Sequence, residues 1–148
     1  MRRLAAVLLA SFFLSACARA PRDPAEACLR EVLASAERRD ADAVLTHVSE
    51  RFRDAEGGDK ADAAALVRRS LAAYASLSLK LEDLAIERGT DAAQAKFRVR
   101  MSGRPRAAAG LEGLLPRSSR WSFDVRLESE PGGWRIVSAS WTRLEDVP

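Results

Sequence analysis

The chain has 148 residues, of which 47% are hydrophobic and 30% are charged, and its formal net charge is +3. This length and composition fit a single globular domain and exclude a collagen-like, coiled-coil or fully disordered chain. Two of the arginines lie in an N-terminal segment that we expect to be removed, which leaves a nearly neutral protein. The composition therefore gives no indication of nucleic-acid binding.

The first residues have the features of a secretory signal. Arg2 and Arg3 precede the apolar run 4–14, which is too short to span a bilayer as a mature helix. The run ends in Leu14-Ser15-Ala16-Cys17, which resembles the lipobox of bacterial lipoproteins. The resemblance implies a signal peptide over residues 1–16 and an acylated Cys17. The alternative is an ordinary signal that is cleaved nearby.

The lipobox resemblance also implies a location. Residues 17–23 would be the lipidated cysteine and a short tether, so the domain would sit close to the membrane. Ala18 follows the cysteine, where an aspartate would commonly mark retention in the inner membrane. We therefore expect a lipid-anchored protein of the cell envelope, in the outer membrane and facing the periplasm.

Apolar residues at intervals of three and four predict three helices at the start of the domain. Asp23 and Asp59 fit the N-cap positions of the first and the third. The expected helices cover about residues 24–39, 40–52 and 59–75.

From residue 77 onward the apolar spacing changes to two, which predicts strands. A slip in the alternation predicts a bulge near Glu82-Asp83. The connection 103–117 is unusually apolar and is interpreted either as a lid or as packing. The expected strands cover about residues 77–86, 93–101, 120–128 and 134–144.

Cysteine and histidine give no candidate metal site or nucleophile. Cys28 lies on the apolar face of the first predicted helix, so we expect a buried and inert thiol. If Cys17 is lipidated, Cys28 has no partner for a disulfide within the chain. His47 is the single histidine and lies on the flank of the second predicted helix. We expect no metal, no cofactor and no Cys/His nucleophile pair.

Two segments resemble the nuclear transport factor 2-like, or cystatin-like, superfamily. They are Glu37-Arg38-Arg39-Asp40-Ala41-Asp42-Ala43, between the first two predicted helices, and the closing strand from Gly133 to Trp141. The resemblance implies an α+β domain over residues 24–148, with three N-terminal helices packed on a curved, mostly antiparallel four-stranded sheet that forms a cone. The superfamily includes ketosteroid isomerases, polyketide cyclases, scytalone dehydratase and non-catalytic accessory domains, so the fold alone does not give the function.

The resemblance also implies a pocket between the sheet and the first helix. Alternation along the two central strands turns only side chains that do not ionise toward this pocket, so we expect no catalytic residue there. Tyr74 and Ser70 are added from the third predicted helix. The expected lining is Tyr74, Ser70, Phe97, Val99, Met101, Trp121, Phe123 and Val125.

Two other sets of residues are candidates for function. Tyr74 and Asp83 are the residues to test for an isomerase, dehydratase or cyclase, although a packed tyrosine and a surface carboxylate are the simpler interpretations. The outward sheet face would present Arg98, Arg100, Arg126, Arg135 and Trp141. It suits an anionic headgroup, an envelope protein or a second copy of the chain, and its alternative is a solvated face with marginal ion pairs.

The sequence thus favours a non-catalytic cell-envelope lipoprotein whose cone binds an apolar small molecule or a partner protein. One alternative is an enzyme of isomerase, dehydratase or cyclase type. The other is a structural or assembly accessory that dimerises through the sheet.

Overall fold

The structure is a computed structural model, and it describes residues 23–107 and 115–144. Its elements in chain order are α1 (Pro24–Glu37), α2 (Ala41–Thr46), β1 (Val48–Asp54), α3 (Lys60–Ala72), β2 (Tyr74–Arg88), β3 (Ala92–Pro105), β4 (Ser118–Glu130) and β5 (Gly133–Leu144). The expected signal peptide, Cys17, the tether up to residue 22 and the middle of the 103–117 connection lie outside the described residues.

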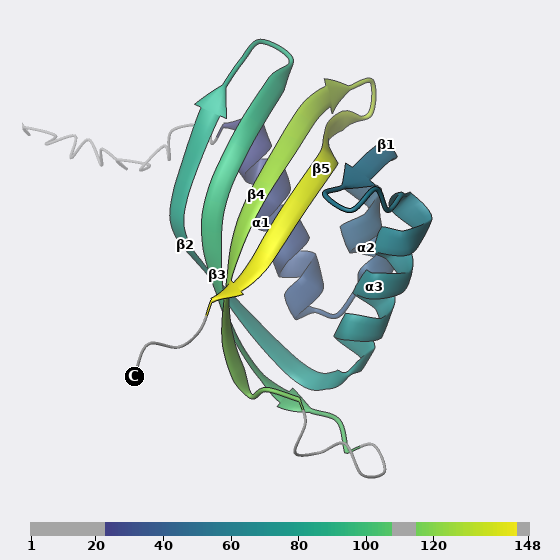
Figure 1. Cartoon of the computed structure of the whole chain (residues 1–148), viewed down its shortest axis with the longest axis vertical. Helices are drawn as coiled ribbons and strands as arrows, with labels where there is room; N and C mark the ends of the chain where they lie inside the picture. The colour runs from purple at the N-terminus through teal and green to yellow at the C-terminus, as the bar shows by residue number, and fades with distance from the viewer. Residues whose placement is uncertain (1–22, 108–114, 145–148) are drawn as a thin grey trace, which may run out of the picture.

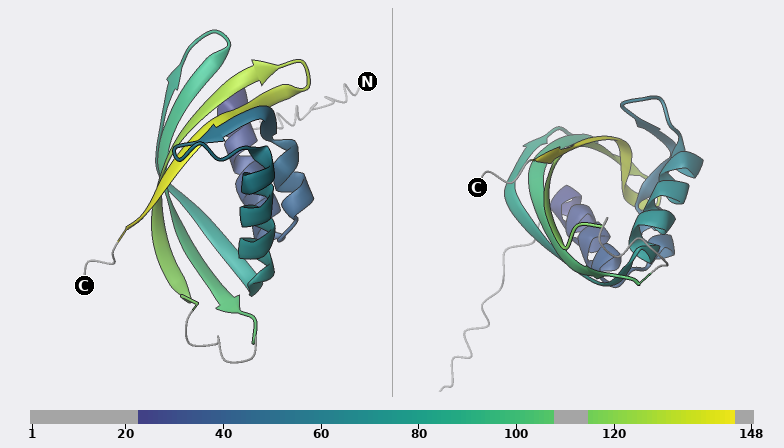
Figure 2. Two further views of the ribbon diagram at one scale, coloured as in Figure 1. Left: turned by 45° about the vertical axis from the view of Figure 1, so that its right-hand side comes forward. Right: turned by 60° about the horizontal axis from the view of Figure 1, so that its bottom comes forward.

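The strands form one curved sheet in the order β1-β5-β4-β3-β2, and every neighbouring pair is antiparallel except β1 with β5. Figure 1 shows the strands running together along the molecule. The sheet curls around α1, and α3 stands across the open side of the curl (Figure 2). The predicted α+β class is confirmed, but the sheet has five strands and not four.

The fifth strand replaces the second half of the second predicted helix. The helix α2 has only six residues and ends at Thr46, with His47 as its C-cap, after which Val48 begins β1 and pairs with Ile136 of β5. Val48 and Phe52 are both buried. Burial along β1 does not alternate, because Ser49 is also buried, Glu50 is exposed, and the register with β5 shifts between Val48 and Arg53. The apolar spacing of four therefore indicated a helix, and the pairing with β5 makes the segment a strand.

The predicted helix starts are confirmed. Asp23 accepts two backbone hydrogen bonds from the first turn of α1, at 2.8 and 3.3 Å. Asp59 forms a capping box with Asp62 at the start of α3. Both caps satisfy amide groups that a helix start leaves without partners. The helices end a little earlier than predicted, α1 at Glu37 and α3 at Ala72.

The predicted bulge in β2 is confirmed. The pairing with β3 passes from Glu82 opposite Arg98 to Ala85 opposite Lys96, which adds a residue to β2. Asp83, inside the bulge, has a φ of 51°, a left-handed conformation that aspartate adopts more readily than most residues. The bulge explains the slip in apolar spacing seen in the sequence.

A second bulge, in β5, was not predicted and changes which side chains share a face. Val137 is an extra residue between two successive pairs with β4. One extra residue shifts the alternation by one position. Beyond the bulge, Trp141 lies opposite Phe123, and Arg143 lies opposite Trp121. The prediction that Trp141 lies on the outward face is therefore wrong: it lies on the concave face.

The hydrophobic core lies between α1, β1 and the concave face of the sheet. Its central contact is the stack of Phe97 on Phe123, with ring centroids 5.3 Å apart and an interplanar angle of 11°. The buried cluster comprises Ala25, Cys28, Leu29, Leu45, Val48, Phe52, Ala93, Ala95, Phe97, Val99, Val125, Leu127 and Ile136.

Candidate functional site

The concave face of β3 and β4 changes from closed to open along its length. Near the β2–β3 and β4–β5 hairpins, which we call the hairpin end, four side chains are enclosed: Ala93, Ala95, Val125 and Leu127. A clasp closes this end, because Arg88 donates to Asp23 at 2.8 Å and lies 4.0 Å from the ring centroid of Trp134. Toward the start of β4, Met101 and Trp121 are only partly buried.

Three aromatic side chains of the open end form what we call the aromatic stripe: Trp121, Phe123 and Trp141. Phe123 and Trp141 are directly opposed across β4 and β5. Trp141 is 38% exposed, the large apolar side chain that the described chain leaves most open. The indole nitrogen of Trp121 donates to Ser119 at 2.9 Å, so its polar atom already has a partner. The stripe therefore offers apolar ring surface to a ligand rather than hydrogen-bonding groups.

One cation accompanies the aromatic stripe. Arg143 lies opposite Trp121 on the concave face and is exposed. Its charge also reaches Tyr74, where it opposes part of the rise in the phenol pKa that burial causes. The bulge at Val137 turns Arg143, like Trp141, toward this face.

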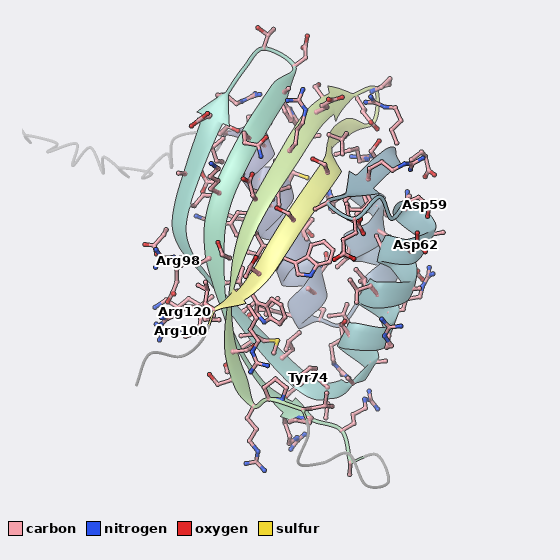
Figure 3. The ribbon with its side chains drawn as sticks, in the orientation of Figure 1. Asp59, Asp62, Tyr74, Arg98, Arg100 and Arg120 are labelled. Atoms are coloured by element: carbon pink, nitrogen blue, oxygen red, sulfur yellow. The ribbon has the colours of Figure 1, made fainter. Side chains whose placement is uncertain are left out.

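Tyr74 lies at the end of the concave face that is farther from the hairpins, beside Gly103 and Pro116. It is 6% exposed, and a Cβ added at Gly103 would meet its ring at 3.0 Å, so the ring lies directly on the β3 backbone. Its hydroxyl donates to the carbonyl of Pro116 at 3.0 Å. The phenol thus packs as an end wall with its donor engaged, and Figure 3 shows it where α3 passes into β2.

The helix α3 packs mainly against β1, α2 and β2 and buries little of its own surface. Leu71 is its one buried residue, while Leu66 and Val67 remain partly exposed. Ser70 is exposed, so the prediction that it lines the pocket is wrong. The helix turns that residue to solvent because its inner face is set by Ala63, Val67 and Leu71, four residues apart.

The residues suggested for an enzyme do not converge. Asp83 is exposed and pairs with Arg98 at 3.1 Å on the convex face of the sheet, the side away from α1. Tyr74 lies on the concave side. The register of β3, β4 and β5 places no carboxylate and no imidazole on the concave face. These three strands therefore supply no general acid–base pair to the aromatic stripe.

The fold brings together a cysteine and a histidine that the sequence treated separately. Cys28 Sγ lies 3.7 Å from His47 Nδ1 and 3.4 Å from the carbonyl oxygen of Trp134, to which the thiol donates. Burial raises the pKa of Cys28 to about 11, and burial together with the Arg135 charge lowers the pKa of His47. The thiol stays protonated at neutral pH, so the contact is no activated nucleophile. The two residues are 19 positions apart, and no local pattern signals the contact.

The convex face carries the predicted arginines, most of them paired. Arg98 pairs with Asp83 at 3.1 Å, and Arg126 pairs with Glu128 at 3.2 Å. Arg135 is partly buried and donates to two carbonyl oxygens of its own turn. Figure 3 shows Arg98, Arg100 and Arg120 grouped on the side of the sheet away from the helices.

The described residues hold no group of three or more His, Cys, Asp or Glu side chains that could bind a metal ion. No helix within residues 23–107 or 115–144 is both long enough and apolar enough to cross a membrane.

The arrangement of helices and sheet defines the nuclear transport factor 2-like, or cystatin-like, α+β fold. A proposed dehydratase of this family from Streptomyces avermitilis superposes with a TM-score of 0.69 at 11% identity, over 82% of this chain and 95% of that one. A superfamily protein from Salmonella enterica gives 0.65 at 17% identity, over 82% and 89%.

Bd1075 of Bdellovibrio bacteriovorus gives a TM-score of 0.66 at 11% identity and is matched over 82% of this chain, but the chain spans only 40% of that protein. No family model matches the sequence, and neither does any curated protein. These likenesses establish the fold and leave the function open.

Proposed function

We propose that this domain binds an apolar small molecule on the aromatic stripe and serves as the non-catalytic binding domain of a cell-envelope lipoprotein. One observation carries the proposal: Trp121, Phe123 and Trp141 lie together on the concave face, and Trp141 is 38% exposed. Exposed aromatic surface in a concave setting is the usual composition of a small-molecule site. Its cost to the free protein is repaid when a ligand covers it.

The closed and open ends of the concave face divide the work. The hairpin end holds the fold together through the buried cluster and the Arg88 clasp. The open end would receive the ligand because Trp141 is exposed there, while Met101 and Trp121 are only partly buried. An apolar side chain of a partner protein has the same chemistry, and it is the second outcome that the experiment distinguishes.

The proposal is tested by native mass spectrometry of the full-length protein extracted in detergent from its own envelope. We expect additional mass of a small molecule on the native protein and on Trp134→Phe, a tryptophan at the hairpin end. Trp141→Ala should lose that mass while keeping its circular dichroism, because Trp141 is exposed. If the stripe instead binds an apolar side chain of a partner protein, the added mass will be that of an envelope protein. Equal loading of Trp141→Ala and native protein would contradict the stripe as the site.

The lipoprotein part of the proposal rests on Leu14-Ser15-Ala16-Cys17 and has its own test. We expect the mature protein to begin at Cys17 and to carry the mass of acyl chains, which anchor firmly when several are present. Cys17→Ala should leave the chain unlipidated. A native protein without acyl mass would refute the anchor and leave the binding proposal standing.

A further inference from the structure

We propose that Arg100 and Arg120, with Ser102 and Ser118 beside them, form a binding site for a phosphate-type oxyanion on the convex face of the sheet. The site lies on the opposite face from the aromatic stripe and does not depend on the proposed function. Three observations carry it: the register of the cations, their incomplete compensation by carboxylates, and the hollow and hydroxyls next to them.

The register places three cations side by side. Lys80 of β2 lies opposite Arg100 of β3, and Arg100 lies opposite Arg120 of β4. Each cation is next in sequence to a residue of the concave face: Leu79, Val99 or Trp121. Because neighbouring side chains of a strand point to opposite faces, the three cations lie on the convex face. Strands are about 4.8 Å apart, and like charges directly opposed across strands destabilise a sheet. An anion between them would remove this repulsion.

Among residues 23–107 and 115–144, the carboxylates of this face do not balance the three cations. Glu82 is shared, with 3.1 Å to Arg100 Nη2 and 3.7 Å to Arg120 Nε. The second distance exceeds that of a hydrogen bond. Arg120 Nε is buried and has no hydrogen-bond partner among the described residues. Arg98, two residues before Arg100 on β3, forms an ion pair with a different carboxylate, that of Asp83, at 3.1 Å. The row therefore retains an unsatisfied donor and excess positive charge.

A hollow lies beside the three cations, and hydroxyl groups lie next to it. A hollow of about 160 Å³ is lined by Arg100, Ser118, Ser119 and Arg120. Two residues further along β3, Ser102 lies opposite Ser118 on the same convex face. Guanidinium and hydroxyl groups both donate to phosphate oxygens, and such charge-assisted hydrogen bonds are among the strongest in proteins. Inorganic phosphate and the phosphate of a lipid headgroup share this chemistry.

The first test measures phosphate binding by isothermal titration calorimetry and thermal unfolding of the full-length protein, with sodium chloride exchanged for sodium phosphate at constant ionic strength. We expect saturable binding by the native protein. The double variant R100Q/R120Q should bind at least about tenfold more weakly, which corresponds to about 1.4 kcal/mol. Phosphate also stabilises proteins by exclusion from their surface, and this effect is common to all variants.

The matched control is R98Q, because Arg98 lies on the same strand and face but has its own carboxylate. It should bind phosphate as the native protein does. S118A removes a hydroxyl without changing the charge and should weaken binding a fewfold, which keeps the test decisive if the double variant folds poorly. Absence of saturable binding in the native protein, or equal losses in R98Q and R100Q/R120Q, would overturn the site.

A flotation arm distinguishes the source of the anion. Native protein and R100Q/R120Q, both carrying Cys17→Ala so that no acyl chain anchors them, are mixed with phosphatidylcholine vesicles with and without phosphatidylglycerol. Flotation of the native protein alone with the anionic vesicles assigns the site to lipid headgroups. Phosphate binding without flotation assigns it to a free phosphate compound. Flotation of both proteins to the same extent, together with unchanged phosphate affinity, would refute both assignments.

Discussion

Phe97 is enclosed between the sheet and α1, with 7% of its surface exposed and its ring stacked on Phe123. Phe97→Ala removes the stack and leaves a cavity, so we expect the free energy of unfolding to fall by about 3–5 kcal/mol. Phe97→Leu should cost less because it fills more of the space. Urea denaturation measures both. Trp141→Ala is the comparison, and a similar loss there would contradict the location of the core.

Cys28 illustrates how burial sets reactivity. Its pKa is raised from 9.0 to about 11, so at pH 8 the folded protein holds about a hundredfold less thiolate than an ordinary cysteine. We expect iodoacetamide to label the peptide 23–30 slowly in the native protein and quickly in urea, as peptide mass spectrometry would measure. Because the folded pKa is the higher one, this thiol's contribution to stability is complete below about pH 9 and is lost as the pH rises toward 11. Equal labelling rates would refute the burial.

At the scale of the elements, the sequence predicted local structure well and pairing poorly. Asp23 and Asp59 were correctly identified as caps because an N-cap side chain bonds to amides only two or three residues later, so the signal is local in the sequence. The bulge at Asp83 was visible because it slips an otherwise regular alternation. Neither β1 nor the bulge at Val137 was predicted, because each is decided by its pairing with another strand, β1 with β5 and the bulge with β4.

These two misses account for most of the error in the candidate site. The bulge moved Trp141 from the convex to the concave face, where it became part of the aromatic stripe. The inward residues of β3 and β4 were predicted correctly, since unbroken alternation leaves only one way to bury Phe97 and Val99. The cation row could be seen only after the register placed Arg100 opposite Arg120.

Polar side chains of the edge strand β1 bond to carboxylates of β4 across the intervening strand β5. Arg51 donates to Glu128 at 2.8 Å and to Glu130 at 3.1 Å, and Ser49 donates to Glu130 at 2.6 Å. The hydrogen bond from Arg51, followed by that from Arg126, lowers the pKa of Glu128. Ser49 does the same for Glu130, with Arg51 adding to it. Both lowered values mean that the network stabilises the fold above the ordinary glutamate pKa and weakens as the pH falls below it.

We therefore expect Arg51→Gln to raise the pKa of Glu128 toward its ordinary value and to speed amide exchange in β1. Carbon-detected NMR titration gives the first and hydrogen exchange the second. Arg53→Gln is the control on the same strand, because the Arg53 side chain donates only to the Phe52 carbonyl in the described hydrogen bonds. If both variants shift the Glu128 titration equally, the effect is one of general charge and not of this network.

Over the whole molecule, burial is uneven from one end of the cone to the other. The buried cluster takes most of its members from the first half of α1, from β3 over residues 93–99 and from β4 over residues 125–127, and the others from α2, β1 and β5. At the open end, α3 has one buried residue, and Met101 and Trp121 are partly exposed. Local opening is favoured where few apolar contacts must be broken. A ligand that enters at the aromatic stripe would meet the part of the molecule that opens most easily.

This gradient predicts the pattern of hydrogen exchange. Amides of β3 over residues 93–99 should exchange most slowly, and those of α3 and of Met101 and Ser102 on the same strand should exchange faster, although both stretches of β3 pair with β2 and with β4. Mass spectrometry of proteolytic fragments resolves the two. If the apolar ligand covers the aromatic stripe, loading should slow exchange in α3 and leave residues 93–99 unchanged. A uniform rate along β3 and α3 would mean that the cone opens as a single unit, and then a ligand could enter only when the whole domain unfolds.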